Sequence, residues 1–274
     1  MTAPSVIVTR QGGATHRSSL LPGLRALVRK DVAEWIHGSR AVVVLAIVSL
    51  FMTLAAANMW INAWVIANVP EAAAGGADKM ISLDPLANLM AGVASQIFVF
   101  ATIFVAMSLL VRERESGTLA WIASKPVNRS SILVSKWLSA SAVLWVVAGI
   151  VPLVLSAVVV TVLYGAPALG AVLVLAIGVG ATIAFFVAVA LAASTFQASQ
   201  PAVAGITFAV LLVPTLLGAI VPFDLASVLP TGILSWTMGL ASGASVGFAT
   251  PIAWLAGMVF LAVIGSRRMA TLEL

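Results

Sequence analysis

The sequence predicts an all-α polytopic membrane protein with six transmembrane helices, cytoplasmic N and C termini, and an amphipathic interfacial helix before the first span. Three observations support this fold class. Hydrophobic residues make up 62% of the 274 residues and charged residues only 8%, whereas about a quarter of a soluble domain is charged. Long charge-free stretches recur along the chain, and basic residues gather in only a few of the segments between them. A soluble globular domain is therefore excluded.

Six charge-free stretches are long enough to cross a bilayer, which takes about 20 apolar residues in a helix. They cover approximately residues 41–64, 86–111, 137–164, 168–194, 202–221 and 248–265. The third, fourth and fifth are separated only by turn-forming residues such as Gly165, Pro167 and Pro201. A β-barrel would show short segments of alternating polar and apolar residues, and these blocks show no such period.

The distribution of basic residues predicts the orientation. Thirteen of the 14 Lys and Arg residues precede the first span, lie between the second and third spans, or follow the sixth, and only Lys79 falls on the other side. Because basic residues collect on the cytoplasmic side of membrane proteins, both termini are expected in the cytoplasm.

The segment before the first span divides into two parts. Residues 1–18 are rich in Ser, Thr and Gly, which predicts a disordered tail. Residues 19–39 alternate apolar and charged positions at helical spacing, which predicts an amphipathic interfacial helix with Ser19 as N-cap and a left-handed Gly38 at its end. This helix is either an anchor alone or also a contact for a cytoplasmic partner. Residues 40–274 are predicted to form the six-helix transmembrane domain, with a cytoplasmic loop at residues 112–136.

The loop at residues 112–136 combines clustered charge with a short apolar helix. Gly117 permits a break after the second span, Thr118 can start a new turn, and Leu119 with Ile122 would form a small apolar ridge. Pro126 then ends the helix. Such a ridge with a charged collar suits docking into a groove on a soluble partner, although a solvated loop that only fixes topology is an equal alternative.

The same loop carries a family resemblance. The run from Glu115 to Leu119, the run Pro126-Val127-Asn128-Arg129, and then Ile132, Leu133 and Lys136 resemble the signature of bacterial ABC transporter permeases of the type-2 (ABC-2-like) class. The span layout, the amphipathic helix and the length are similar as well. The resemblance implies a coupling helix that seats on an ATPase, with the following contact residues: Glu113, Glu115, Gly117, Thr118, Leu119, Ile122, Pro126 and Arg129.

The resemblance also implies the rest of the assembly. The chain has no Gly-x-x-x-x-Gly-Lys-Ser/Thr phosphate loop, so it is not expected to be an enzyme or to hold a cofactor. ATP and Mg would be bound by a separate cytoplasmic nucleotide-binding subunit. A second permease subunit, identical or related, would complete a dimer in the bacterial plasma membrane, and no nucleic-acid partner is expected. The implied function is that of the permease subunit of an ATP-driven exporter.

The substrate is not specified by the sequence. The polar residues proposed for a substrate path are Asn58, Asn62 and Gln96. Without cysteine and with only two histidines, the chain predicts no metal site. Two other functions remain open: a secondary transporter driven by an ion gradient, and a membrane scaffold that does not transport. The first is disfavoured because no Asp, Glu, Lys, Arg or His lies between Trp137 and Phe223.

Overall fold

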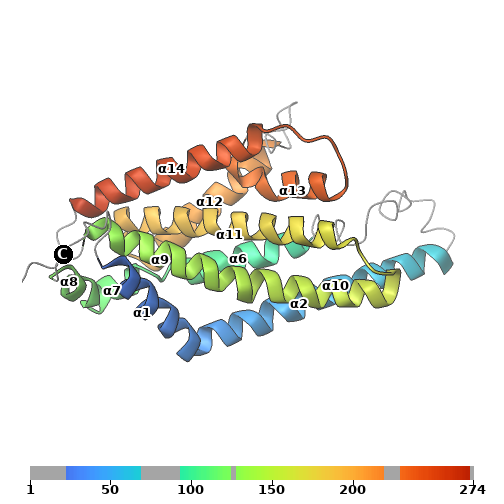
Figure 1. Ribbon diagram of the computed structural model, residues 1–274, viewed down its shortest axis with the longest axis horizontal. Helices are drawn as coiled ribbons and strands as arrows, with labels where there is room; N and C mark the ends of the chain where they lie inside the picture. Colours follow the sequence, from blue (N-terminus) through green and yellow to red (C-terminus); the bar gives the residue numbers. More distant parts are fainter. Residues whose placement is uncertain (1–22, 69–92, 125–127, 219–228, 272–274) are drawn as a thin grey trace, which may run out of the picture.

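The protein is a bundle of long helices that run along one common axis (Figure 1). The computed structural model describes residues 23–68, 93–124, 128–218 and 229–271, and this part of the chain contains helices and no strand. The all-α prediction is therefore confirmed. The long elements are α2 (Ser39–Asn68), α6 (Val93–Ala106), α9 (Arg129–Leu144), α10 (Val151–Tyr164), α11 (Leu169–Phe196), α12 (Gln200–Gly218) and α14 (Ala249–Ala270).

Five helical segments among the described residues are long and apolar enough to cross a bilayer. They are residues 39–58, 96–115, 129–164, 169–196 and 249–270. The expected fifth span coincides with α12, where residues 200–214 form a further but shorter apolar helix. A polytopic membrane protein is thus supported, and the total of six spans remains a prediction.

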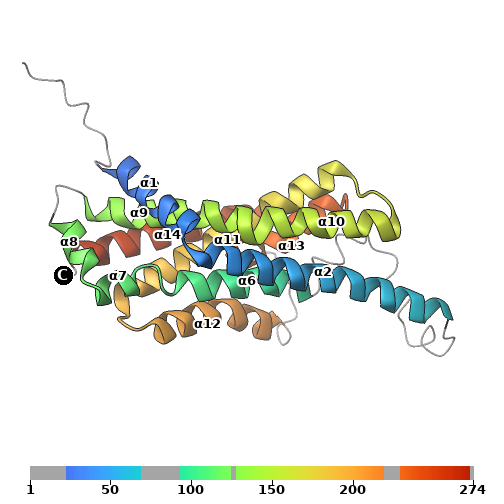
Figure 2. The ribbon, with the colours of Figure 1, turned by 90° about the horizontal axis from the view of Figure 1, so that it is seen from below.

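One end of the bundle gathers the charged residues, and we call it the basic end. It comprises α1 (Leu24–His37), α7 (Val111–Glu115), α8 (Thr118–Ala123), the starts of α2 and α9, and the end of α14. Figures 1 and 2 show α1 lying obliquely across the bundle at this end, and α7 and α8 lie at the same end. Because α1 packs on α9 and meets α2 at an elbow, it is positioned against the start of two membrane-spanning helices.

Glycine allows the other helices to approach α11, the central helix. α11 packs against α6, α9, α12, α14 and α13 (Ile233–Ala241). A Cβ atom added at Gly178 would overlap the side chain of Thr237 in α13, including its Cβ atom at 2.7 Å. A Cβ atom at Gly180 would meet the indole of Trp145 at 2.7 Å. Small residues at helix contacts are a common means of packing in membranes, so the Gly178–Gly180 pair is structural.

We expect Gly178→Ala to destabilise the protein by about 1–3 kcal/mol, because the added methyl group overpacks the contact between α11 and α13. Gly205→Ala in α12 is the matched control, since a Cβ atom there meets nothing within 4 Å. Replacing a helical glycine with alanine at such a site is neutral or slightly stabilising. Thermal unfolding in detergent measures both variants, and equal melting temperatures would contradict the close packing.

The third span contains a local widening of the helix. A π-helical turn, η2 (Trp145–Ile150), joins α9 to α10 and ends two residues before Pro152. Proline has no backbone N–H, and π-turns occur where a helix must accommodate such an interruption. The indole of Trp145 donates a hydrogen bond to the Ala176 carbonyl oxygen on α11 at 2.8 Å. Trp137 and Trp254 donate in the same way to Ala184 and Ala181, so three indoles fasten neighbouring helices to α11.

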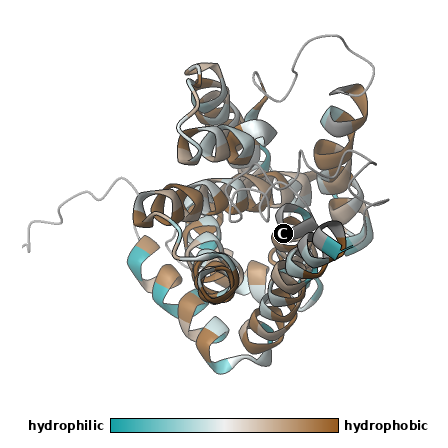
Figure 3. Cartoon of the chain, turned by 90° about the vertical axis from the view of Figure 1, so that its right-hand side faces the viewer, coloured by the Kyte–Doolittle hydropathy of each residue, from teal (hydrophilic) through white to brown (hydrophobic). Residues whose placement is uncertain are grey.

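The outer surface of the bundle is apolar. Figure 3, seen along the bundle, shows brown, hydrophobic residues along most of the helices. Exposed side chains include Leu54 of α2, Val158 of α10, Ile177 of α11 and Val259 of α14. Soluble monomers rarely expose contiguous apolar surface of this extent, whereas lipid tails cover it without cost.

Buried hydroxyl groups find hydrogen-bond partners within their own helices. Those of Thr182 and Ser156 donate to the carbonyl oxygens four residues earlier.

Several sequence-based boundaries were wrong. The third helix begins at Arg129 rather than near Trp137, so the predicted 112–136 loop consists of α7, α8 and the first turns of α9. Gly38 is extended (φ −89°) instead of left-handed. Gly23 precedes α1 with φ +81°; the proposed cap Ser19 and the tail at 1–18 lie outside the described residues. The short helix α13 was not predicted.

Candidate functional site

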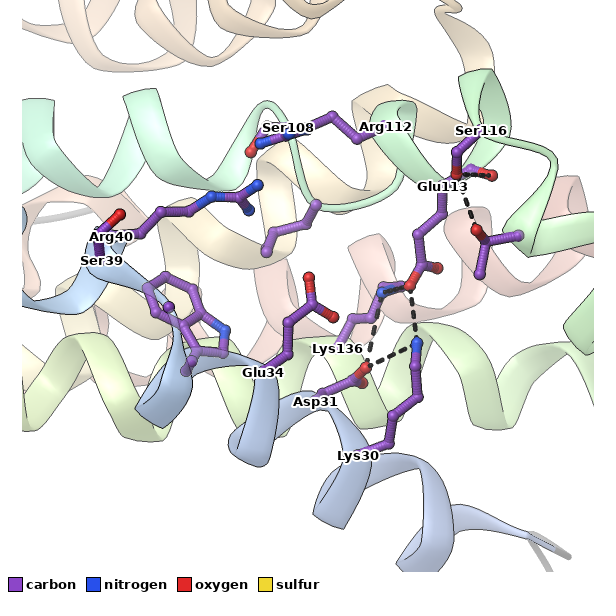
Figure 4. A pocket seen from close by; sticks show the side chains of 14 residues that line it. Lys30, Asp31, Glu34, Ser39, Arg40, Ser108, Arg112, Glu113, Ser116 and Lys136 are labelled. Carbon is purple, nitrogen blue, oxygen red and sulfur yellow. Dashed lines mark hydrogen bonds and ion pairs between the residues drawn. The ribbon is translucent and has the colours of Figure 1, made fainter.

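Four charged side chains meet where α1, α7 and α9 come together, and we call them the charged cluster: Lys30, Asp31, Glu113 and Lys136 (Figure 4). Lys136 Nζ lies 2.8 Å from Glu113 Oε1 and 3.8 Å from Asp31 Oδ1. Lys30 Nζ lies 3.2 Å from the same Glu113 oxygen and 3.8 Å from Asp31 Oδ1. The cluster therefore links the amphipathic helix to the segment after the second span and to the start of the third.

Burial determines the electrostatics of this cluster. The side chains of Lys136 and Asp31 are only 7% and 8% exposed. Burial is the largest influence on Asp31 and raises the pKa of its carboxyl group, although Lys136 and Lys30 pull it down. Burial lowers the pKa of Lys30, but Glu113 and Asp31 together outweigh it, so the pKa lies above its usual value. The Ser135 hydroxyl donates to Asp31 Oδ2 at 3.2 Å. The two lysines thus stabilise the negative charges of the two carboxylates at this buried position.

The raised pKa of Asp31 has a definite consequence for stability. The folded protein holds the proton on this carboxyl group more tightly than the unfolded chain does. The stabilisation from this group is therefore complete below the pKa of the unfolded chain and is lost as the pH rises through the raised pKa. The two lysines lower the pKa of Asp31 and so limit this loss, but they do not reverse it.

Gly117 sets the direction of α8. Its φ is +71°, a left-handed conformation that glycine adopts readily. This residue lies between α7 and α8, and its N–H bonds to the Arg114 carbonyl oxygen at 3.2 Å. The hydroxyls of Ser116 and Thr118 bond to each other across the turn at 2.8 Å. The predicted break at Gly117 is confirmed, and α8 begins at Thr118.

The apolar ridge of α8 faces the protein itself. Leu119 and Ile122 are 0% and 5% exposed and belong to the hydrophobic core. The expectation that they form a docking ridge is therefore wrong: apolar side chains on this short helix are stabilised by packing against the bundle. The outward face instead presents Ala120, Trp121 and Ser124, with Trp121 64% exposed. Glu115 and Gly117 are also exposed.

Two arginines fasten the ends of other helices to this region. Arg114 Nη1 donates to the carbonyl oxygens of Ser194 and Gln197 at the end of α11, at 3.1 and 3.3 Å. Arg129 Nη1 donates to the carbonyl oxygen of Ala270 at the end of α14, at 3.3 Å. Carbonyl groups at a helix C-terminus carry partial negative charge, which a guanidinium group complements. The sequence predicted that Arg129 contacts a partner, but its side chain is hydrogen-bonded within the chain.

The other predicted site residues lie apart from this region. Asn58 and Gln96 are exposed on α2 and α6. The side chain of Asn62 and all of Pro126 lie outside the described residues. Their roles remain predictions.

Three carboxylates at the charged cluster have oxygens within 4.8 Å of one another: Asp31, Glu34 and Glu113. Carboxylate oxygens are ligands for hard cations. Here, however, the ammonium groups of Lys30 and Lys136 already neutralise Asp31 and Glu113. The arrangement gives no reason to place a metal ion, and the prediction that the chain has no metal site stays a prediction.

Sequence reasoning missed Lys30, Asp31 and Ser135 and treated Lys136 only as part of a motif. One signal was present. Asp31 precedes Trp35 by one helical turn and lies in the stripe that α1 buries, because Asp31 and Trp35 are the buried residues of that helix. A carboxylate within a buried stripe requires a partner. The partner itself had no local signal, since Lys136 is far away in the sequence.

The comparison with known families agrees with this architecture. The sequence matches the family described as ABC-2 family transporter protein over residues 25–264, which include every helix of the charged cluster. No curated protein matches the chain. The matched region covers most of the chain and all five candidate spans except the last residues of α14. This chain is therefore a multi-pass membrane protein that belongs to the ABC-2 family of transporter proteins.

Proposed function

We propose that this chain is the membrane-spanning subunit of an ATP-driven exporter and that it is driven through α8 by a separate cytoplasmic ATPase. The family match supports a permease subunit of an ABC transporter. The export direction, the ATPase partner that binds ATP and Mg, and pairing with a second permease subunit follow from the resemblance of residues 115–136 to type-2 permeases. The bacterial plasma membrane is the proposed location, with the basic end in the cytoplasm.

One observation carries the proposal: charged side chains in the two segments that flank α8, namely α7 and the start of α9, connect these segments to other helices of the bundle. Glu113 is paired with α1 and α9, Arg114 with the end of α11, and Arg129 with the end of α14. Leu119 and Ile122 pack α8 itself into the core. A movement of α8 would therefore reach several helices through its packing and through the flanking segments, a continuous network of the kind that can carry coupling between sites.

In this proposal the partner binds the outward face of α8. Trp121 supplies a large exposed side chain, and Glu115, Gly117 and Ala120 are also exposed in this segment. Aromatic residues with a polar rim are typical of the energetically important centre of an interface. ATP binding by the partner would move α8, and the charged cluster would carry that movement to α1 and α9.

The described spans offer little to an ion-gradient mechanism. Their ionisable residues lie at the basic end, and α10, α11, α12 and α13 contain no Asp, Glu, Lys, Arg or His. Secondary transporters that move protons use ionisable groups near the midplane. An apolar interior suits amphipathic or lipid-like cargo better than highly charged cargo.

Purification of the tagged chain in mild detergent tests the proposal. We expect a soluble subunit with a Walker phosphate loop to copurify with it. Trp121→Ala should weaken binding of that subunit by about thirtyfold and lower its recovery accordingly, since truncating an interface hot spot costs about 2 kcal/mol or more. Trp60→Ala is the control, because Trp60 is also exposed but lies on α2 away from the basic end. Copurification of no ATPase, or an equal loss for both variants, would contradict the proposal.

A further inference from the structure

A polar cleft of about 470 Å³ opens beside the charged cluster. It lies between α1 and the start of α2 on one side and α7 with the residues before it on the other (Figure 4). Its volume falls within the range of small-ligand sites. Most of its wall consists of charged and hydroxyl side chains, so its occupant should be polar and charged.

The charges that line the cleft form two sets. The charged cluster is internally paired and carries two positive and two negative charges. The second set is Glu34, Arg40 and Arg112, whose side chains form no hydrogen bond and no close ion pair among the described residues. Glu34 acts on Lys30 only through a longer-range attraction. These three side chains are exposed and extend into the cleft. An external ligand can therefore pair with two guanidinium groups and one carboxylate.

This set of charges matches one class of molecule. Guanidinium groups bind phosphate oxygens through paired hydrogen bonds. A carboxylate accepts hydrogen bonds from a primary ammonium group, which a trimethylammonium group cannot donate. A phosphodiester joined to a primary amine would pair with all three side chains.

The surroundings of the cleft favour a lipid. The cleft lies at the elbow of an amphipathic helix and a membrane-spanning helix, where headgroups meet the protein. Directly beyond Arg40, α2 exposes Val42, Val43 and Ile47, which provide an apolar surface for acyl chains. We propose that this cleft binds the headgroup of a phospholipid that carries a primary amine, such as phosphatidylethanolamine. Arg40 and Arg112 would hold its phosphate, and Glu34 its ammonium group.

Lipid binding to the purified, delipidated chain tests this proposal without the ATPase partner, so its outcome is independent of the proposed function. Native mass spectrometry would measure retention of phosphatidylethanolamine, phosphatidylcholine and phosphatidylglycerol. We expect phosphatidylethanolamine to bind about tenfold more tightly than phosphatidylcholine, since a hydrogen bond to a charged group contributes about 1.5 kcal/mol or more. Glu34→Gln should abolish this preference and leave phosphatidylglycerol binding intact.

A charge-matched pair of double variants provides the control. Arg40→Gln with Arg112→Gln should weaken binding of both phosphatidylethanolamine and phosphatidylglycerol by about tenfold or more. Arg25→Gln with Arg29→Gln removes the same charge from exposed positions on α1 outside the cleft and should change neither. Equal binding of the amine and choline lipids, equal effects of the two double variants, or equally tight binding of soluble glycerophosphoethanolamine would overturn the proposal.

Discussion

Glu113→Ala is expected to lower the melting temperature of the protein by roughly 6–12 °C, corresponding to about 3 kcal/mol at roughly 2–4 °C per kcal/mol. The substitution removes the carboxylate that lies 2.8 Å from the Lys136 ammonium group, whose side chain is 7% exposed. A buried charge that loses its partner costs several kcal/mol. We take the lower end of that range because Asp31 remains 3.8 Å away.

Two further variants make this prediction specific. Glu115→Ala removes an exposed carboxylate two residues away and should change stability by less than about 0.5 kcal/mol. Glu113→Ala combined with Lys136→Met leaves one lysine and one aspartate in balance, so the double variant should be more stable than Glu113→Ala alone. Equal melting temperatures for the Glu113 and Glu115 variants, or additive losses in the double variant, would show that the charged cluster is not a stabilising unit.

Gly117→Pro is expected to reduce ATP-driven transport by at least about tenfold, a typical magnitude for the loss of coupling between two sites. Proline fixes φ near −65°, whereas this residue has φ +71°. The substitution also removes the N–H that bonds to the Arg114 carbonyl oxygen. The turn between α7 and α8 cannot form in its present shape, so α8 would no longer present Trp121 in the same direction.

This loss can be measured in inverted vesicles that contain the permease and its ATPase. Two quantities are followed in the same vesicles: the ATP-dependent accumulation of an amphipathic fluorescent probe and the rate of ATP hydrolysis. Hydrolysis should continue while accumulation falls. Gly117→Ala should retain most transport, since a Cβ atom there meets nothing within 4 Å and only the left-handed backbone costs about 1–2 kcal/mol. Gly243→Pro is the control because Gly243 also has positive φ but lies in the turn between α13 and α14. Normal accumulation by Gly117→Pro would refute the role of this turn.

The long helices were predictable because the physics that forms them is local in sequence. The first, fourth and sixth predicted spans differ from α2, α11 and α14 by only a few residues at each end. A charge-free run of 20 or more residues with charged flanks leaves few alternatives in a bilayer. The predicted third span was too short because charged residues were assumed to lie outside the membrane helix. Lys136 lies in α9 and is buried, since Glu113 and Asp31 neutralise it.

The site was predictable only in part. The pattern of α8 identified a short helix with an apolar ridge, but periodicity cannot say whether a ridge faces a partner or the protein's own core, and Leu119 and Ile122 face the core. The charged cluster joins residues far apart in the chain, and such pairing has no local signature. α13 was missed because nine residues are too short to cross a bilayer, and it forms by packing Thr237 against Gly178 of α11.

Single-cysteine crosslinking to the ATPase most directly tests whether α8 receives the energy of ATP hydrolysis. The chain has no cysteine of its own, so each introduced thiol is unique. Ala120→Cys places the thiol on the exposed face of α8, and Ala166→Cys places it at an exposed position in the turn between α10 and α11, away from the basic end. Our account predicts crosslinks to a nucleotide-hydrolysing subunit from Ala120→Cys alone. Crosslinks from Ala166→Cys alone, or from neither variant in a complex that transports, would contradict it.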